Sequence, residues 1–152
     1  MADERPWFTD FAALADEEIR LRLLDMRADQ PSYHFAIEPR TMDLELGRIL
    51  IRFDTHPSIS LYAGNIGYQI HLEHRGHRYA ARACRLLRPV ALWHGVTELW
   101  IITSPDNFAS RRTAELAGGA YVDTHDMPPG TDMYAQGMHQ ARRYRWSFDV
   151  IP

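Results

Sequence analysis

Hydrophobic and polar residues alternate in short stretches over the first half of the chain. Residues 18–23 read Glu-Ile-Arg-Leu-Arg-Leu, and this period of two predicts a strand with one buried face. The adjacent Leu23 and Leu24 break the alternation, so a helix remains the alternative for this segment. Stretches rich in β-branched and aromatic residues, bounded by Pro, Gly or Ser, predict three further strands at 33–37, 46–53 and 61–71.

A helical period replaces this alternation near residue 80. Residues 80–94 carry apolar side chains three and four positions apart, which predicts an amphipathic helix that Pro89 bends, because proline has no N–H to donate. Residues 98–103 are almost all apolar and predict a strand covered on both faces. The remaining pattern predicts a helix capped by Asp106 or Asn107 and running to about Ala117, a strand at 120–124, an irregular loop at 127–137 and a closing strand at 142–150.

The order of these elements predicts the α+β class. Strands at both ends of the chain would flank a central strand–helix–strand–helix unit, giving a mixed, mostly antiparallel sheet of about seven strands. A crossover helix joins parallel strands, so the strands on either side of residues 80–94 are expected to be parallel. The chain has no repeat and no linker-like tract, which indicates one domain over residues 1–152. Within it, Phe8 and Phe11 stand at helical spacing and predict a partly helical arm at 1–16.

Composition and charge narrow the function classes. The hydrophobic content of 45% is typical of a globular chain, and the single cysteine, Cys84, cannot close an internal disulfide. The sequence has no membrane-spanning apolar run and no signal-peptide pattern at its N-terminus, so we expect a cytoplasmic protein without a membrane partner. The formal net charge of −3 argues against nucleic acid as a partner, whereas the local arginines at 75–88 and 111–112 favour small anionic ligands.

The junction between the fourth strand and the long helix, residues 67–80, is the most informative segment. A buried strand ends here, a tight loop with Gly76 follows, and a helix begins. The first N–H groups of a helix have no partner within it and lie at the positive end of its dipole, so they bind phosphate readily. Arg75 and Arg78 add positive charge, and the small Ala80 lets a ligand approach. The segment therefore predicts a pyrophosphate site.

Two motifs in this region resemble a known family. Residues 75–80, Arg-Gly-His-Arg-Tyr-Ala, match the [Gln/Arg]-x-x-Gly-x-[Gly/Ala] acyl-CoA signature of the GNAT family of N-acetyltransferases, except that Arg78 stands where the signature has glycine. Residues 104–119 are similar to the Asn-x-x-Ser-x-x-x-x-Glu-x-x-Gly segment that is common in members of the ribosomal-protein type. The resemblance covers residues 45–124 well and the remaining strands loosely.

The resemblance implies a fold, a cosubstrate and a set of roles. A GNAT-like chain is expected to bind acetyl-CoA and to transfer its acetyl group directly to a primary amine of a small molecule or a protein N-terminus. The backbone of Ile70 and Leu72 would pair with the pantetheine arm, and Asn107 would bond the pantetheine or position a water. Ser110 would face the CoA thiol. The residues expected to hold the CoA phosphates are Arg75, Gly76, His77, Arg78, Tyr79, Ala80 and Arg111.

The reaction also needs a base, because an acceptor amine is mostly protonated at pH 7. His71 is the first candidate, since it ends the strand nearest the acyl site and an imidazole titrates near neutral pH. Glu38 and Glu73 are the alternatives. The expected catalytic residues are therefore His71, Asn107 and Ser110.

The same region carries a run of histidines. His71, His74 and His77 are spaced as H-x-x-H-x-x-H, which raises the question of a metal. They straddle a strand end and a turn, and no second cluster of ligands supports them, whereas a zinc site needs ligands that converge tetrahedrally. We therefore expect no metal site.

Three departures from the family pattern bear on activity. Arg78 replaces the glycine, and Ala114 stands seven residues after Asn107, where many members carry a tyrosine that acts as general acid. Ser110, Tyr134 or solvent would then have to protonate the leaving thiolate. The two helices that normally lie between the first two strands have no counterpart, so the acceptor side is either open or completed by residues 127–137 or a partner subunit.

These departures leave a second function open. A catalytically inactive CoA-binding module with a regulatory or scaffold role is the alternative to an acetyltransferase, and nucleic-acid binding through the arginine-rich loop is a third reading. The partners expected for the first function are an acyl-CoA and an amine acceptor. A homodimer would cover a strand at the edge of the sheet.

Overall fold

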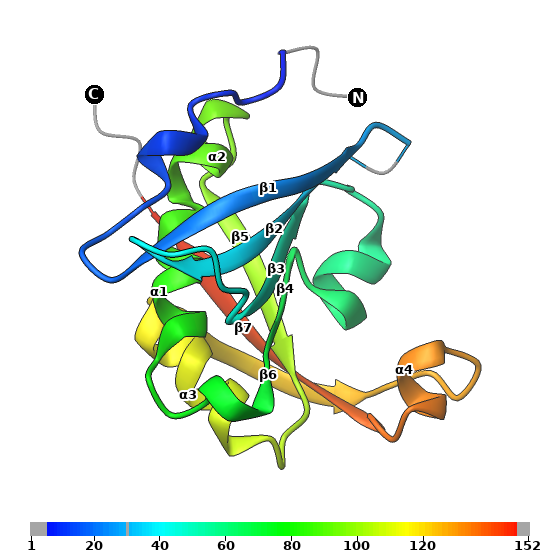
Figure 1. The fold of residues 1–152 in the computed structure, drawn as a ribbon. Coiled ribbons are helices and arrows are strands. Elements are labelled where there is room, and N and C mark those ends of the chain that lie inside the picture. The colour runs from blue at the N-terminus through cyan, green and yellow to red at the C-terminus, as the bar shows by residue number, and fades with distance from the viewer. Residues whose placement is uncertain (1–5, 30, 149–152) are drawn as a thin grey trace.

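The computed structural model describes residues 6–29 and 31–148, which form an α+β fold (Figure 1). The strands are β1 (Ile19–Arg27), β2 (Ser32–Pro39), β3 (Gly47–Arg52), β4 (Ile66–Ile70), β5 (Glu98–Thr103), β6 (Ala120–Asp126) and β7 (Gln140–Ser147). The helices are α1 (Tyr79–Leu86), α2 (Arg88–Trp93), α3 (Phe108–Ala117) and α4 (Asp132–Ala135). Shorter helical segments are η1 (Phe11–Ala13), the π-helix η2 (Ile59–Ala63) and η3 (Leu72–His74).

The strands form two antiparallel sheets, with the orders β1-β2-β3-β4 and β5-β7-β6. The sheets meet where the N–H of Asn65 donates to the carbonyl of Trp100 at 2.8 Å and the Trp100 N–H donates to Oδ1 of Asn65 at 2.8 Å. Because a side chain makes the second of these bonds, the contact does not continue as a ladder. β4 and β5 therefore share no ladder in the described residues.

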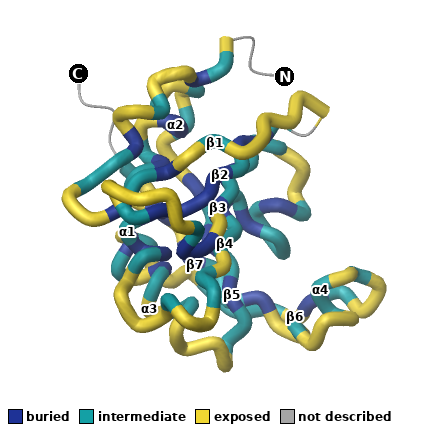
Figure 2. The backbone as a smooth tube through the Cα atoms, viewed as in Figure 1, coloured by how far each residue is buried: buried dark blue, intermediate teal, exposed yellow. Residues whose placement is uncertain are grey.

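The first sheet buries one of its faces. The register aligns Phe35 with Ile49 on the inner face, and it aligns His34, Leu50 and Gly67 in a row on the outer face. Apolar residues of α1 and α2 share a single core with the inner face. Figure 2 shows this core as the buried stretch along β2 and β3. The core residues from the two helices and their junction include Ala83, Cys84, Leu87, Val90 and Ala91.

The outer face of the first sheet has no helix over it in the described residues. β1 and β2 form a hairpin with Arg27 opposite Ser32, and the described residues between them form only a turn. Arg48 and Gln69 are exposed on this face. The described residues between β1 and β2 therefore place no helix on this face.

A bulge explains the broken alternation in the first predicted strand. Residues 19–27 form a strand, as predicted, and its register with β2 shifts between Leu23 and Asp25. Leu24 is the extra residue of this irregularity, so a single insertion reverses the faces of the residues beyond it. Residues 1–5 of the predicted arm lie outside the described residues, and in the remainder Phe8 is buried with its N–H donating to Oη of Tyr33 at 2.7 Å.

Other predicted elements need correction at their boundaries. The predicted strand at 61–71 begins only at Ile66, and residues 59–63 form η2, because a short apolar run is compatible with a helix as well as a strand. The predicted helix at 80–94 is divided into α1 and α2, with Pro89 in the first turn of α2. The loop predicted at 127–137 contains α4, at the tip of the projecting β6–β7 hairpin (Figure 1). The predicted end of the closing strand, residues 149 and 150, lies outside the described residues.

Candidate functional site

Two residues in the loop between β4 and α1 have a left-handed backbone conformation, with positive φ. Gly76 has φ +93°, and a β-carbon placed on it would meet nothing within 4 Å. Arg78 caps α1 with φ 63° and ψ 24°, and it is the only residue besides glycine with a positive φ in the described chain. This conformation costs about 1–2 kcal/mol for a residue with a β-carbon. The backbone geometry therefore explains why the signature that the loop resembles has glycine at this position.

The start of α1 is available to a ligand. Arg78 makes no side-chain cap, so the first N–H groups of α1 keep no partner within the helix. The side chain of Arg75 folds back, with its Nε donating to the carbonyl of Ile70 at 3.0 Å. Both arginines are exposed, and neither forms an ion pair with a carboxylate in the described residues. Two positive charges therefore flank the positive end of a helix dipole.

The start of α3 forms the opposite side of the same region. Asn107 caps this helix, as predicted, and its Oδ1 accepts a hydrogen bond from the Ser110 N–H at 3.0 Å. The Oη of Tyr68, on β4, donates to the carbonyl of Ser110 at 3.1 Å and lies 2.8 Å from its Oγ. Burial raises the pKa of Tyr68, so its phenol stays protonated at neutral pH. The pair therefore presents two hydroxyl groups in their neutral form.

A cavity of about 370 Å³ opens between β4, the loop before α1 and the start of α3. It contains both the α1 N-terminus and the Tyr68–Ser110 pair. The structure thus brings together residues that are about 40 positions apart in the chain. The residues predicted for the site that line this cavity are Ile70, Arg75, Gly76, Arg78, Tyr79, Ala80, Asn107 and Ser110.

Three residues predicted to contact CoA do not line the cavity. Leu72 is 76% exposed, and the ring of His77 lies 5.3 Å from that of Tyr79, measured between centroids. Arg111 donates from Nη1 to the carbonyl of Pro105 at 3.0 Å. Arg111 could reach a ligand in another rotamer of its long side chain. The roles of Leu72, His77 and Arg111 stay predictions.

The predicted base, His71, lies outside this cavity. Its Nε2 is 2.6 Å from Oε2 of Glu45, whose Oε1 accepts a hydrogen bond from Nε of Arg48 at 2.9 Å. The hydrogen bond from His71 is the main cause that lowers the pKa of Glu45. The sequence offered no sign of this pairing, because the two residues are far apart in the chain and meet only when β4 pairs with β3.

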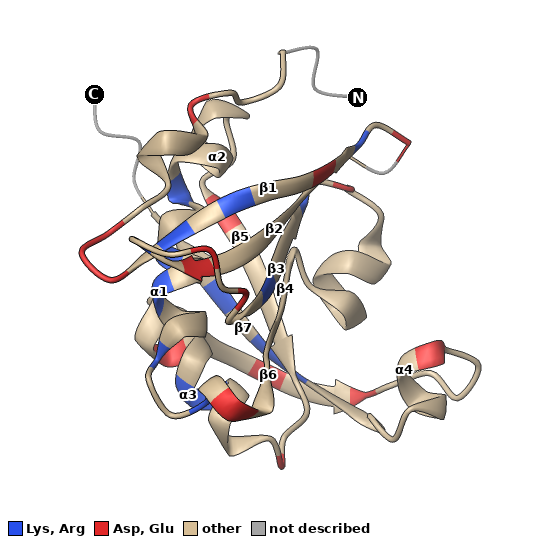
Figure 3. Ribbon diagram, viewed as in Figure 1, with Lys and Arg blue, Asp and Glu red and all other residues tan. Residues whose placement is uncertain are grey.

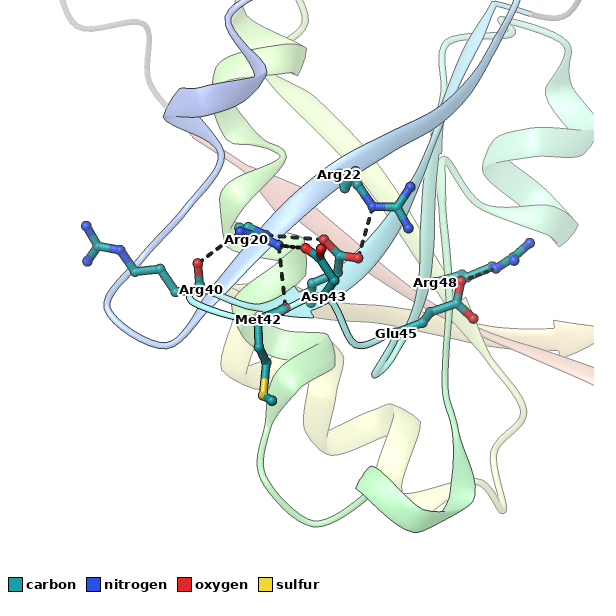
Figure 4. Close-up of polar contacts among 8 residues, drawn as sticks. Arg20, Arg22, Arg40, Met42, Asp43, Glu45 and Arg48 are labelled. Carbon is teal, nitrogen blue, oxygen red and sulfur yellow. Dashed lines mark hydrogen bonds and ion pairs between the residues drawn. The ribbon is translucent and has the colours of Figure 1, made fainter.

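Glu38, an alternative base, is occupied by two arginines. Its carboxylate is 2% exposed, with Oε1 3.2 Å from Nε of Arg20 and Oε2 2.9 Å from Nε of Arg22. Figure 4 shows Arg20 also reaching Asp43, with Nη2 and Oδ1 2.6 Å apart. A buried carboxylate that is neutralised in this way stabilises the β1–β2 pair. Its geometry favours a structural role over proton transfer.

Sequence reasoning missed five residues that line the cavity. Tyr68 is the most informative of them, because its hydroxyl contacts Ser110 and it was assigned only to a strand. A signal was present in the Ile-Gly-Tyr stretch before the loop, since a tyrosine next to a strand glycine can reach past the edge of the sheet. The five residues are Tyr68, Gln69, His74, Ala109 and Thr113.

A second cavity, of about 540 Å³, lies on the outer face of the first sheet. Its lining comes from β1, β2, β3 and β4, and includes Leu24, His34 and Leu50. It shares Tyr68 and Gln69 with the first cavity. Residues Tyr68 and Gln69 of β4 therefore border both spaces, and Figure 3 shows basic residues on β1 and β3 in this sheet.

The described part of the chain also bears on metal binding and on membrane spans. It holds no group of three or more His, Cys, Asp or Glu side chains placed to bind a metal ion. None of its helices has the length and apolar character needed to span a membrane.

Known structures share this fold at low sequence identity. A putative ribosomal-protein-serine acetyltransferase from Vibrio cholerae is 20% identical, with a TM-score of 0.57 over 80% of this chain and 64% of its own. RimL, a ribosomal L7/L12 alpha-N-protein acetyltransferase crystallised with coenzyme A, is 14% identical, with a TM-score of 0.61 over 79% and 64%. The microcin C7 self-immunity acetyltransferase MccE, crystallised with acetyl-CoA and AMP, is 16% identical, with a TM-score of 0.56 over 77% and 61%.

These structures are longer than the present chain, which spans less than two thirds of the length of each. No curated protein matches it in sequence. A sequence model of the family described as "Acetyltransferase (GNAT) domain" matches residues 2–120, which is well over half of the 152 residues. The chain therefore belongs to the GNAT acetyltransferase family.

Proposed function

We propose that this protein binds acetyl-CoA in the first cavity and transfers the acetyl group to a primary amine of a small molecule or a protein N-terminus. One observation carries the proposal: the open N-terminus of α1 and the Tyr68–Ser110 hydroxyl pair face the same cavity. The first can bind a pyrophosphate and the second can donate hydrogen bonds at the other end of the ligand. Relatives crystallised with acetyl-CoA or CoA support this choice of ligand.

The pyrophosphate would be held by the loop before α1. The backbone of Gly76 to Ala80 would supply N–H groups, and Arg75 and Arg78 would supply charge. The edge of β4 that faces β5 has no ladder partner in the described chain, so the backbone near Ile70 can pair with the pantetheine amides. The acetyl thioester supplies an activated carbonyl carbon when it is bound.

The transfer itself would be a direct exchange of bonds. The amine nitrogen forms a bond to the carbonyl carbon, the carbon–sulfur bond breaks, and the amine loses one proton while the thiolate gains one. The neutral hydroxyls of Tyr68 and Ser110 would stabilise the departing thiolate, which takes up a proton from one of them or from water. They would thus replace the tyrosine that is missing at Ala114, which is fully buried.

A covalent enzyme intermediate does not fit the cysteine of this chain. Cys84 is fully buried within α1, and burial raises the pKa of its thiol to about 12. The thiolate is the nucleophilic form of cysteine, and it is scarce at neutral pH when the pKa is this high. Direct transfer is therefore the mechanism that the residues support.

The base that takes the amine proton would act from outside the two cavities. His71 remains the predicted base, but it lines neither cavity and its Nε2 is bound to Glu45. A chain of waters would have to connect it to the amine. An acceptor that is deprotonated by solvent before it binds would need no such connection.

The inactive CoA-binding module is the second candidate function. Arg78 in a left-handed conformation and alanine at position 114 are the observations that favour it. The two functions differ in turnover alone, since both require CoA binding.

The test is release of free CoA thiol from acetyl-CoA in the presence of a panel of primary amines and N-terminal peptides. The active enzyme is expected to release thiol and to yield an acetylated product by mass spectrometry. Binding of acetyl-CoA without turnover of any amine would favour the inactive module, and absence of binding would contradict both functions.

A further inference from the structure

Arg52 lies beside the second cavity and has a buried nitrogen without a hydrogen-bond partner. The Nε of Arg52 is buried and makes no hydrogen bond, and its guanidinium forms no ion pair in the described residues. It lies at the rim of the cavity, because a β-carbon placed on Gly67 would be 3.8 Å from its Nη2. A half-buried guanidinium without a counter-charge in contact is costly, so an anion placed here would gain a strong interaction.

In the described residues no carboxylate forms an ion pair with this arginine, and Asp54 acts on it only as a nearby negative charge. Asp25 faces the cavity, but its Oδ2 is 3.0 Å from Nε of Arg27. Arg48 also lines the cavity, and it is bound by Glu45. The carboxylates of Asp25 and Glu45 are therefore bound to other arginines, and the guanidinium of Arg52 has no carboxylate in ion-pair contact in the described residues.

His34 responds to the same positive charge. It lies on the outer face next to Arg52, with Nε2 3.1 Å from Oγ of Ser32. Burial is the main cause that lowers its pKa, the charges of Arg27 and Arg52 lower it further, and the charge of Asp25 opposes them without reversing the shift. A neutral imidazole can donate a hydrogen bond to an anion without a charge of its own.

We propose that the second cavity receives the acceptor and selects a small primary amine that also carries a carboxylate or phosphate group, with Arg52 as the anion-binding residue. This inference rests on the proposed function. The volume of about 540 Å³ suits a small molecule. The anionic group would lie against Arg52 over Gly67, and the amine would extend along β4 to Tyr68 and Gln69, which border the first cavity as well.

Direct binding tests this selection without requiring catalysis. The probes are two matched pairs, O-phosphoethanolamine with ethanolamine and β-alanine with β-alanine amide, so that phosphate and carboxylate are compared separately. Each is titrated calorimetrically into the protein saturated with CoA. The proteins are the wild type, Arg52→Met, Arg52→Lys, and the control Arg145→Met, which removes an exposed arginine of the second sheet.

We expect the anionic member of at least one pair to bind the wild type about tenfold more tightly than its neutral partner, which corresponds to about 1.4 kcal/mol. Arg52→Met should abolish this preference, Arg52→Lys should keep part of it, and Arg145→Met should leave it unchanged. Circular dichroism and CoA affinity check that each variant is folded. Three results would overturn the inference. They are equal affinity within both pairs, a lack of binding by both anionic probes, and a preference that survives Arg52→Met.

Failure of this inference differs from failure of the proposed function. If CoA does not bind, the first cavity has been assigned wrongly. If CoA binds and amines are acetylated without regard to their charge, the proposed function stands and only the selection by Arg52 is refuted.

Discussion

The two cavities that Tyr68 and Gln69 of β4 border are formed by different parts of the fold. The first includes the start of α1 and a loop in which Gly76 and Arg78 have positive φ. The second is made of side chains from four strands, on a face that no described helix covers. A local segment of sequence can encode the first kind of site, whereas the second depends on which residues the sheet register brings together. This difference explains why one site could be predicted from the sequence and the other could not.

The first cavity depends on one side chain that the sequence did not reveal. Tyr68→Phe removes the hydroxyl that contacts Ser110, and we expect turnover to fall about 100-fold, the effect of losing one donor that stabilises developing charge. The KM for acetyl-CoA should change little, because the phosphate contacts are elsewhere. Steady-state kinetics measures both quantities.

The control for this variant is Tyr121→Phe, whose hydroxyl contacts Thr124 at 3.0 Å on an exposed strand. It should keep the activity of the wild type. Equal activity of Tyr68→Phe and the wild type would show that Tyr68 has only a packing role.

The outer face of the first sheet depends on its buried carboxylate. Glu38→Gln leaves Arg20 and Arg22 facing an amide, and we expect the free energy of unfolding to fall by about 2 kcal/mol. Urea denaturation measures this loss. Acetyl-CoA affinity should stay the same in the folded variant, because Glu38 does not line the first cavity.

Asp43→Asn is the matched control, since Asp43 contacts the same Arg20 but its side chain is 94% exposed. It should cost much less stability than Glu38→Gln. If the two variants were equally stable, the buried ion pairs would not be what joins β1 to β2.

The backbone of the first cavity can be tested at its strained residue. Arg78→Gly should raise the free energy of unfolding by about 1 kcal/mol, because glycine adopts φ 63° without strain. Arg78→Ala should not, since alanine retains the β-carbon that causes the strain. Thermal unfolding of the three proteins measures the order of stability, and an alanine variant as stable as the glycine variant would contradict the strain argument.

The smallest effect is expected at the buried cysteine. Cys84→Ala should change turnover by no more than about twofold per folded molecule, because a neutral thiol is not a nucleophile. Loss of activity with an intact fold would instead favour a covalent intermediate.

The raised pKa of Cys84 predicts how the stability of the protein depends on pH. Its thiol titrates with a pKa raised from 9.0 to about 12 in the folded state, so the unfolded chain loses the proton first. Between these values the unfolded state binds fewer protons, and stability therefore falls as the pH rises. Chemical denaturation at about pH 8 and about pH 10, on either side of the unfolded pKa, should show a smaller decline in Cys84→Ala than in the wild type.

The parts of the fold that sequence reasoning predicted were those set by local pattern. The strand over β1, the cap at Asn107 and the loop at 75–80 follow from residues close together in the chain. The π-helix at 59–63 was missed, because its apolar run has the composition of a strand. The division into two sheets was not predicted, because it depends on Asn65 meeting Trp100 through its side chain, with no β4–β5 ladder in the described residues.

The parts of the site that escaped prediction are tertiary contacts. The partner of His71 is Glu45, on the segment before the neighbouring strand, and the partner of Tyr68 is Ser110 on α3. Arg52 was interpreted only as part of a strand. That its Nε is buried without a hydrogen bond depends on the folded structure and cannot be read from the sequence.

The central claim is that the loop before α1 binds the pyrophosphate of acetyl-CoA, and one comparison tests it most directly. Calorimetry should be run with acetyl-CoA on the wild type, Gly76→Asp and Gly137→Asp. Both glycines have positive φ, +93° and +98°, and a β-carbon placed on either would meet nothing within 4 Å, so the two variants carry the same strain and charge. Binding that is lost in Gly76→Asp and kept in Gly137→Asp is the predicted result. Equal binding by all three proteins would contradict the claim.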